Sequence, residues 1–122
     1  MKNSQLLETF EALQFISTIE TPLPATINYA RAVNMKKLGT YFDEFTNAKD
    51  ELIRKYGTTE DGSRYTFDGE NKDKYYAELS DLLNVDVDVT LQKISADALM
   101  TLALTPKQFD ALMLIADDKE VE

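Results

Sequence analysis

The feature that most constrains this chain is a helical register that runs without a proline from about residue 25 to residue 56. Pro24 precedes it and Gly57 follows it, at positions that favour the start and the end of a helix. The sequence therefore predicts one helix of about 45 Å at 1.5 Å per residue, with Gly39 as its weakest point. Its apolar residues recur every three to five positions: Ile27, Ala30, Met35, Leu38, Phe42, Phe45, Ala48, Leu52 and Tyr56.

Shorter helical patterns lie on both sides of this segment. We expect an amphipathic helix that is capped by Asn3 or Ser4, carries Leu6, Phe10, Leu13 and Ile16, and ends at the prolines of residues 21–24. Three further helices are expected after residue 57, with Asn71, Ser95 and Thr105 as their caps. Their apolar stripes comprise Tyr75, Leu79, Leu82 and Leu83, then Leu99 and Leu102, then Phe109, Leu112, Met113 and Ala116.

Two short segments have the composition of strands. Residues 64–67 combine aromatic and β-branched side chains, and residues 85–89 alternate valine with aspartate. We expect them to pair and to pack their apolar face on the long helix, because an isolated ribbon is marginal in water. The predicted fold is therefore α+β and mostly α, with a long central helix packed by shorter helices and a small two-stranded antiparallel ribbon.

A chain of 122 residues is expected to form a single domain over residues 1–122, with a frayed acidic tail at 117–122. One buried stripe should hold this domain together. It should comprise Leu38, Phe42, Phe45 and Leu52 of the long helix, packed against Leu6, Phe10, Leu13, Leu79 and Leu83.

The chain contains neither cysteine nor histidine. This composition excludes disulfides and thiolate nucleophiles, and it removes the usual zinc ligands and the commonest general base. Carboxylates remain available for hard cations or for acid and base chemistry, but no motif predicts a cofactor. No apolar run is long enough to cross a bilayer, and the first helix carries Glu8 and Glu11, which a secretory signal would exclude, so we expect a cytoplasmic protein.

The net charge of −9 is unevenly distributed. Residues 1–56 contain seven acidic and seven basic residues, whereas residues 57–122 contain fifteen acidic and six basic residues. Such a second half would repel a phosphate backbone, so direct nucleic-acid binding is not expected. The asymmetry favours a basic protein partner or serves solubility alone.

Five acidic residues are the candidates for a partner-binding surface: Glu60, Asp61, Asp81, Asp86 and Asp88. The carboxylates of Asp86 and Asp88 should share one face of a strand, roughly 7 Å apart, where they could hold Mg²⁺ or Ca²⁺ or simply face solvent. Residues 60–70 suggest a calcium loop, but they lack the ligand spacing of an EF-hand and fit a pair of turns better.

The order of several short motifs resembles that of small uncharacterised proteins of tailed phages and prophages, over roughly residues 3–94. The resembling pieces are residues 21–25, 35–38, 50–57, 58–63 and 78–87. The resemblance implies a phage or mobile-element setting, and it transfers no catalytic residue.

These observations favour a non-enzymatic, phage-type accessory protein that acts by binding another protein. One form of this hypothesis is an inhibitor of a host defence or nucleic-acid enzyme, in the host cytoplasm, which uses its acidic surface. A virion-assembly or homo-oligomeric structural protein is the alternative. A carboxylate-metal enzyme is a further hypothesis, and it would require more carboxylates to meet Asp86 or Asp88.

Overall fold

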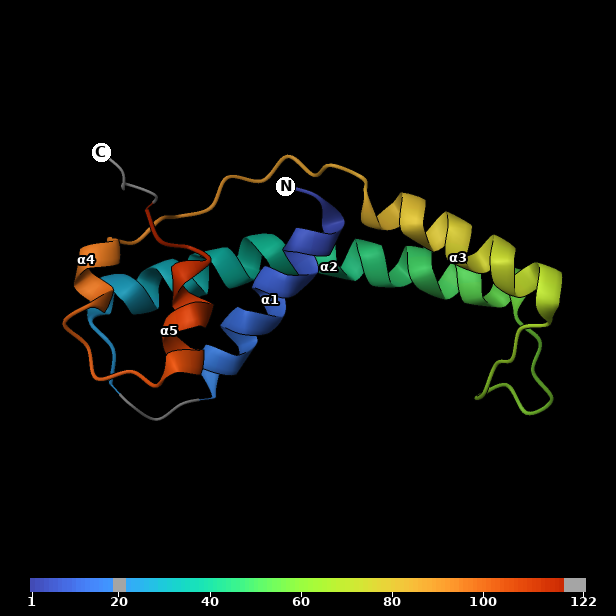
Figure 1. Cartoon of the computed structure of the whole chain (residues 1–122), viewed down its shortest axis with the longest axis horizontal. Coiled ribbons are helices and arrows are strands. Elements are labelled where there is room, and N and C mark those ends of the chain that lie inside the picture. The colour runs from blue at the N-terminus through green and yellow to red at the C-terminus, as the bar shows by residue number, and fades with distance from the viewer. Residues whose placement is uncertain (19–21, 118–122) are drawn as a thin grey trace.

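The computed structural model describes residues 1–18 and 22–117, and these residues are mostly helical (Figure 1). The chain forms helices α1 (Asn3–Ser17), α2 (Ala25–Tyr56), α3 (Gly69–Leu83), α4 (Ala96–Leu99) and α5 (Pro106–Met113). The predicted long helix and the shorter helices that pack on it are thereby confirmed.

Helix α2 has the bounds that its flanking residues predict, although Pro24 is its N-cap rather than a residue of its first turn. Gly57 ends the helix in an extended conformation, with φ −91°. A Cβ atom at Gly57 would lie 2.7 Å from the carbonyl oxygen of Ile53 and 3.1 Å from the ring of Tyr65. Glycine is therefore required here by the close approach of neighbouring atoms.

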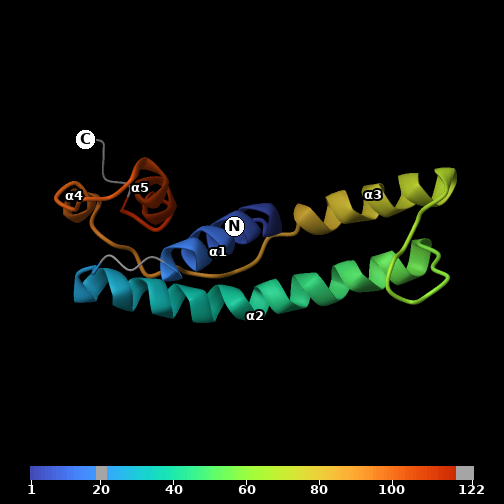
Figure 2. The same cartoon turned by 90° about the horizontal axis from the view of Figure 1, so that it is seen from below.

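All the other helices lie on one side of α2 (Figure 2). Helices α1, α4 and α5 gather near its first half, and α3 runs back along its second half. Helix α1 contacts both α2 and α5, so it forms the middle of three stacked elements. The second half of α2 and α3 together make an extended two-helix unit, here called the arm.

The main core lies between α1, the first half of α2 and the C-terminal part of the described chain. The rings of Phe10 and Phe42 stack within it, with centroids 4.5 Å apart. Its buried members are Leu6, Phe10, Leu13, Ile16, Ile27, Ala30, Leu38, Ile94, Leu99, Ala111, Leu112, Ile115 and Ala116. Leu6, Phe10, Leu13 and Leu38 belong to the predicted buried stripe, whereas that stripe included no residue from 94–116. Leu99, Leu112 and Ala116 lie on the apolar faces predicted for the later helices.

The arm is packed separately from the main core. The buried ring of Tyr75 stacks on Phe67 at a centroid distance of 4.6 Å and meets Tyr76 edge-on at 5.2 Å. The predicted single stripe is therefore wrong in its second half, because Leu52, Leu79 and Leu83 are only partly buried and lie outside the main cluster.

The predicted two-stranded ribbon is not formed. The backbone of Thr66 forms a β-bridge with that of Thr58 instead, which closes the loop between α2 and α3. Two further backbone bridges join Asp86 to Lys2 and Ile94 to Ala116. Helix α3 separates residues 64–67 from residues 85–89, and its 15 residues span about 22 Å at 1.5 Å each. The two segments therefore lie too far apart to share backbone hydrogen bonds.

The predicted helix caps are partly correct. The Ser95 and Thr105 hydroxyls accept hydrogen bonds from the amides of Ala98 (3.4 Å) and Gln108 (3.2 Å). By contrast, α1 and α3 begin earlier than expected, with Lys2 and Asp68 as their N-caps.

Asn3 has a different role from the one that its sequence position suggests. It is buried inside the first turn of α1, and its side-chain amide donates to the Leu82 carbonyl at 2.9 Å. Asn71 likewise lies within α3 rather than at its cap.

The extended segment, residues 85–94, runs from α3 back along the first half of α2 (Figure 1). The fully buried Asn34 of α2 holds this segment, because its Nδ2 donates to the carbonyl of Gln92 (2.9 Å) and its Oδ1 accepts from the Gln92 amide (2.8 Å). One and two turns further along α2, Lys37 Nζ donates to the Thr90 carbonyl (2.8 Å) and the Tyr41 hydroxyl donates to the Asp88 carbonyl (3.2 Å). Three side chains of α2 thus form hydrogen bonds with backbone groups of this segment that a neighbouring strand of the predicted ribbon would have formed.

Two predicted features fall wholly or partly on residues outside the described ranges. The prolines at 22 and 24 are described, but residue 21 is not. Of the predicted frayed tail 117–122, only Asp117 is described, and its amide donates to the Ile94 carbonyl at 2.7 Å.

Replacing Asn34 with alanine should lower the free energy of unfolding by about 1 to 3 kcal/mol, because the fully buried side chain of Asn34 and its two partly buried hydrogen bonds to the Gln92 backbone are lost. Urea denaturation measures this change. The control is Asn47→Ala, at an exposed position of the same helix, which should change stability by less than about 0.5 kcal/mol. Equal effects of the two substitutions would contradict the role given to Asn34.

Replacing Gly39 with alanine should stabilise the protein by up to about 1 kcal/mol, because alanine is the better helix former. A Cβ atom at this position would meet only Phe10 Cε1, at 3.7 Å, which is an ordinary van der Waals contact. Thermal and urea denaturation should both show the gain. A loss of stability would mean that Phe10 cannot accommodate the added methyl group.

Candidate interaction surfaces

The five acidic residues predicted to bind a partner fall into two separate groups. Glu60 and Asp61 lie in the loop that joins α2 to α3, whereas Asp81 lies near the end of α3 and Asp86 and Asp88 follow it. Most of α3, which spans about 22 Å in all, lies between the two groups. The structure therefore does not bring the five together as one surface.

Asp61 organises its own loop. Its Oδ1 accepts hydrogen bonds from the Ser63 amide (3.0 Å), the Ser63 hydroxyl (3.1 Å) and the Arg64 amide (3.2 Å). These donors, the Ser63 amide first, hold the pKa of Asp61 below its ordinary value. Gly62 has φ +82°, a left-handed conformation that glycine adopts without strain. The sequence prediction of a turn is confirmed, and this carboxylate is already engaged within the loop.

The loop also encloses a small polar hollow of about 390 Å³. It is lined by Thr58, Thr59, Glu60, Asp61, Arg64 and Thr66. Within residues 1–18 and 22–117, no group of three or more acidic side chains is placed to hold a metal ion. Among these described residues, further carboxylates of the kind that the metal-enzyme hypothesis requires meet neither this loop nor Asp86 and Asp88.

The second group, here called the acidic ledge, consists of Asp81 near the end of α3 and of Asp86 and Asp88 at the start of the extended segment. Asp81 lines one hollow and Asp88 another. All three residues are exposed. Val87 and Val89 are partly buried and pack against the main core, so the predicted alternation of inward valine and outward aspartate is confirmed over residues 86–89 without the ribbon. It is wrong at Val85, which is 47% exposed. In the described part of the chain, the ion pairs are Lys55–Glu78 and Lys74–Glu70, and neither involves the ledge.

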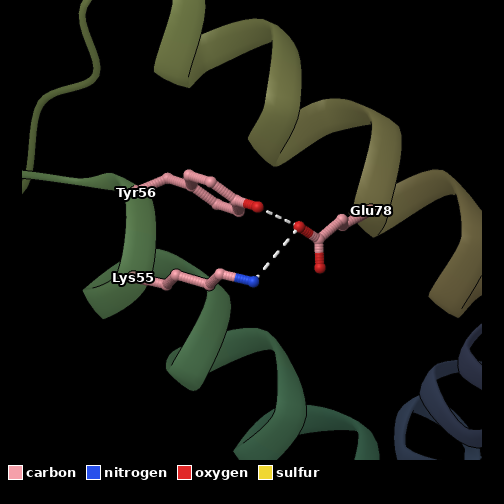
Figure 3. Close-up of polar contacts among 3 residues, drawn as sticks. All are labelled: Lys55, Tyr56 and Glu78. Atoms are coloured by element: carbon pink, nitrogen blue, oxygen red, sulfur yellow. Dashed lines mark hydrogen bonds and ion pairs between the residues drawn. The ribbon is translucent and has the colours of Figure 1, made fainter.

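A polar cluster joins the end of α2 to the middle of α3 (Figure 3). The Tyr56 hydroxyl donates a hydrogen bond to Glu78 Oε2, and Lys55 Nζ lies 3.5 Å from the same oxygen. The Tyr56 hydrogen bond, followed by the charge of Lys55, lowers the pKa of Glu78. Because the Lys55 and Glu78 side chains are 60% and 41% exposed, this ion pair contributes little stability. The cluster orients the two helices of the arm.

A groove between α1 and α5 is the surface that the sequence did not reveal. Its volume is about 840 Å³, and its lining comprises Ser4, Leu7, Glu8, Glu11, Ala12, Phe15, Lys107, Asp110, Ala111 and Leu114. Leu7 and Phe15 are apolar residues of α1 that lie outside the face packed on α2. They were the one sign in the sequence that a second apolar surface exists on this helix. This sign could not be interpreted from sequence, because nothing placed α5 beside α1.

The comparisons with known proteins leave the family open. No family model, curated protein or solved structure matches the chain. Among the described helices, none combines the length and the apolar character that are needed to span a membrane.

The carboxyl group of Asp61 should titrate below its ordinary pKa of 3.8, because the loop donors stabilise its charged form. A carboxyl group with a lowered pKa adds stability above its unfolded value and loses that contribution as the pH falls through the folded value. The loop should therefore loosen only in acid, below the ordinary aspartate range. NMR titration of the Asp61 side-chain carbon measures the midpoint.

The control for this titration is Ser63→Ala, which removes one of the four donors and keeps the two backbone amides and the Thr59 hydroxyl. It should return the Asp61 midpoint only part of the way to 3.8. A wild-type midpoint at or above the ordinary value would contradict the loop geometry.

Proposed function

We propose that this chain is a non-enzymatic accessory protein that binds another protein, and that this partner is basic. The acidic ledge is the observation that carries the proposal. Its three carboxylates are exposed and make no ion pair with other described residues. Complementary charge speeds association and selects for partners of opposite sign.

The way in which the ledge is held also supports a binding role. The backbone at Asp86 is fixed by its bridge to the backbone of Lys2, and the Asp88 carbonyl accepts a hydrogen bond from Tyr41 of α2. Asn34 holds the same segment further along, at Gln92. A partner that contacts these carboxylates would therefore meet side chains on an ordered backbone, which reduces the entropy lost on binding. The absence of histidine and cysteine from the sequence is consistent with a role outside catalysis.

A specific form of the proposal is an inhibitor of a host defence or other nucleic-acid enzyme, acting in the cytoplasm of a cell that carries the phage or prophage. Such enzymes present basic grooves that bind phosphate, and an acidic protein can occupy them. The fifteen acidic and six basic residues of positions 57–122 fit this role better than direct contact with nucleic acid. The proposal includes neither a membrane nor a cofactor.

Reversing both strand carboxylates, in the variant Asp86→Lys with Asp88→Lys, should weaken capture of the partner by about tenfold or more. The fold should survive, because both side chains are exposed and their valine neighbours are unchanged. Tagged protein that is produced in its host cells provides the capture assay, and each captured protein is re-measured as a purified pair at increasing salt. Affinity should fall as the ionic strength rises.

A matched variant separates a specific surface from general acidity. Glu60→Lys with Asp73→Lys makes the same change in net charge at two exposed positions in or near the loop between α2 and α3. It should leave capture almost unchanged. The proposal fails if the two double variants behave alike, or if the affinity of the purified pair is insensitive to salt.

A homo-oligomeric structural protein, including a virion-assembly component, is the second candidate, and a hollow on the arm favours it. This hollow has a volume of about 430 Å³, and Ala48, Leu52, Leu82 and Val85 provide its apolar lining. Val85 is 47% exposed, although it is a large apolar residue. A second copy could cover this area. Sedimentation that shows only monomer at high protein concentration would remove this candidate.

A further inference from the structure

The groove between α1 and α5 has a lining of two kinds. Leu7, Ala12, Phe15, Ala111 and Leu114 give it an apolar floor. Leu114 is 36% exposed, which is unusual for a leucine beside a packed core. An apolar hollow of this kind at the seam of two helices is a common place for a partner side chain to anchor.

The charged residues of the groove define the chemistry of a partner. Three exposed carboxylates, those of Glu8, Glu11 and Asp110, lie along the groove with a single ammonium group, that of Lys107. Lys107 Nζ is already engaged, since it lies over the ring of Phe15 at 4.3 Å from its centroid. The groove therefore presents unmatched negative charge on both helices to an incoming group.

The length of the groove fits a helix. Its lining on α1 extends from Ser4 to Phe15, which is about 17 Å at 1.5 Å per residue, or about three turns. An amphipathic helix of that length presents three or four apolar residues on one face, at i, i+3, i+4 and i+7.

We infer that this groove binds an amphipathic helix of a partner protein, with leucine-like side chains on its inner face and lysine or arginine at its edges. The site is distinct from the acidic ledge, so it does not rest on the function proposed above. The apolar residues of the partner helix would contact Leu7, Phe15 and Leu114, and its basic residues would pair with Glu8, Glu11 and Asp110.

A synthetic helical peptide of about 14 residues tests this inference, with leucines at i, i+3, i+4 and i+7 and lysines beside them. Amide shifts in the NMR spectrum of the full chain locate the bound peptide. They should be largest on α1 and α5 around Leu7, Phe15 and Leu114. Two control peptides have the same length, one with the leucine positions scrambled and one with glutamate in place of lysine. The affinity of each should be lower by about tenfold or more.

Matched protein variants assign the contact. Leu114→Lys should weaken peptide binding by about tenfold or more, whereas Met100→Lys, at an apolar residue that is 73% exposed outside the groove, should not. If Leu114→Lys disturbs the fold, the double variant Glu8→Lys with Glu11→Lys tests the groove at exposed positions and should also weaken peptide binding. The double variant Glu60→Lys with Asp73→Lys, which makes the same change in net charge outside the groove, is its control.

Four outcomes would overturn the inference. They are the absence of peptide binding, equal binding of the control peptides, and shifts that map to the acidic ledge instead of the groove. The fourth is a dimer of the free protein that Leu114→Lys dissociates, because the groove would then bind a second copy of this chain.

Discussion

The side-chain amide of the fully buried Asn34 holds the extended segment after α3 on the first half of α2, between backbone bridges at Asp86 and Ile94. An extended segment without a neighbouring strand has backbone groups that need partners. Asn34 satisfies both the amide and the carbonyl of Gln92 from inside a helix, as an adjacent strand would. With the segment held in this way, Val87 and Val89 face the core, α5 lies beside α1, and α4 lies beside α5.

The length of α2 divides the molecule into two regions with different kinds of packing. Around its first half, α1 is covered on two sides and contributes four of the buried aliphatic and aromatic side chains, Leu6, Phe10, Leu13 and Ile16. Around its second half, α3 is the one helix of the described chain that packs on it, and stacked rings and the Tyr56–Glu78 contact replace a full core. Few buried apolar contacts are typical of regions that open before the rest of a domain.

Sequence reasoning was strongest where a signal is local. The bounds of α2, the caps at Ser95 and Thr105 and the turn at Asp61 all follow from side chains acting on their own backbone. Sequence reasoning failed for contacts between segments that are far apart in the chain. The alternation in residues 85–89 indicates a half-buried extended segment, but it does not show which element that segment packs against. An asparagine in a long polar helix gave no sign that it would be fully buried.

The candidate surfaces show the same limit. Exposure of Asp81, Asp86 and Asp88 could be predicted from composition and alternation, but not their separation from Glu60 and Asp61, which depends on the length and direction of α3. The groove could not be predicted at all, because it requires α1 and α5, nearly a hundred residues apart, to be neighbours.

The contacts from Lys37 and Tyr41 to the extended segment end on main-chain carbonyls, and those of Asn34 end on the amide and the carbonyl of Gln92. Main-chain atoms are the same whatever residue carries them. Mutation can therefore replace the outward side chains at positions 86, 88 and 90 while the anchoring contacts persist. Single substitutions at these three positions can therefore change the surface charge of the extended segment during evolution, while its main-chain contacts with α2 stay the same.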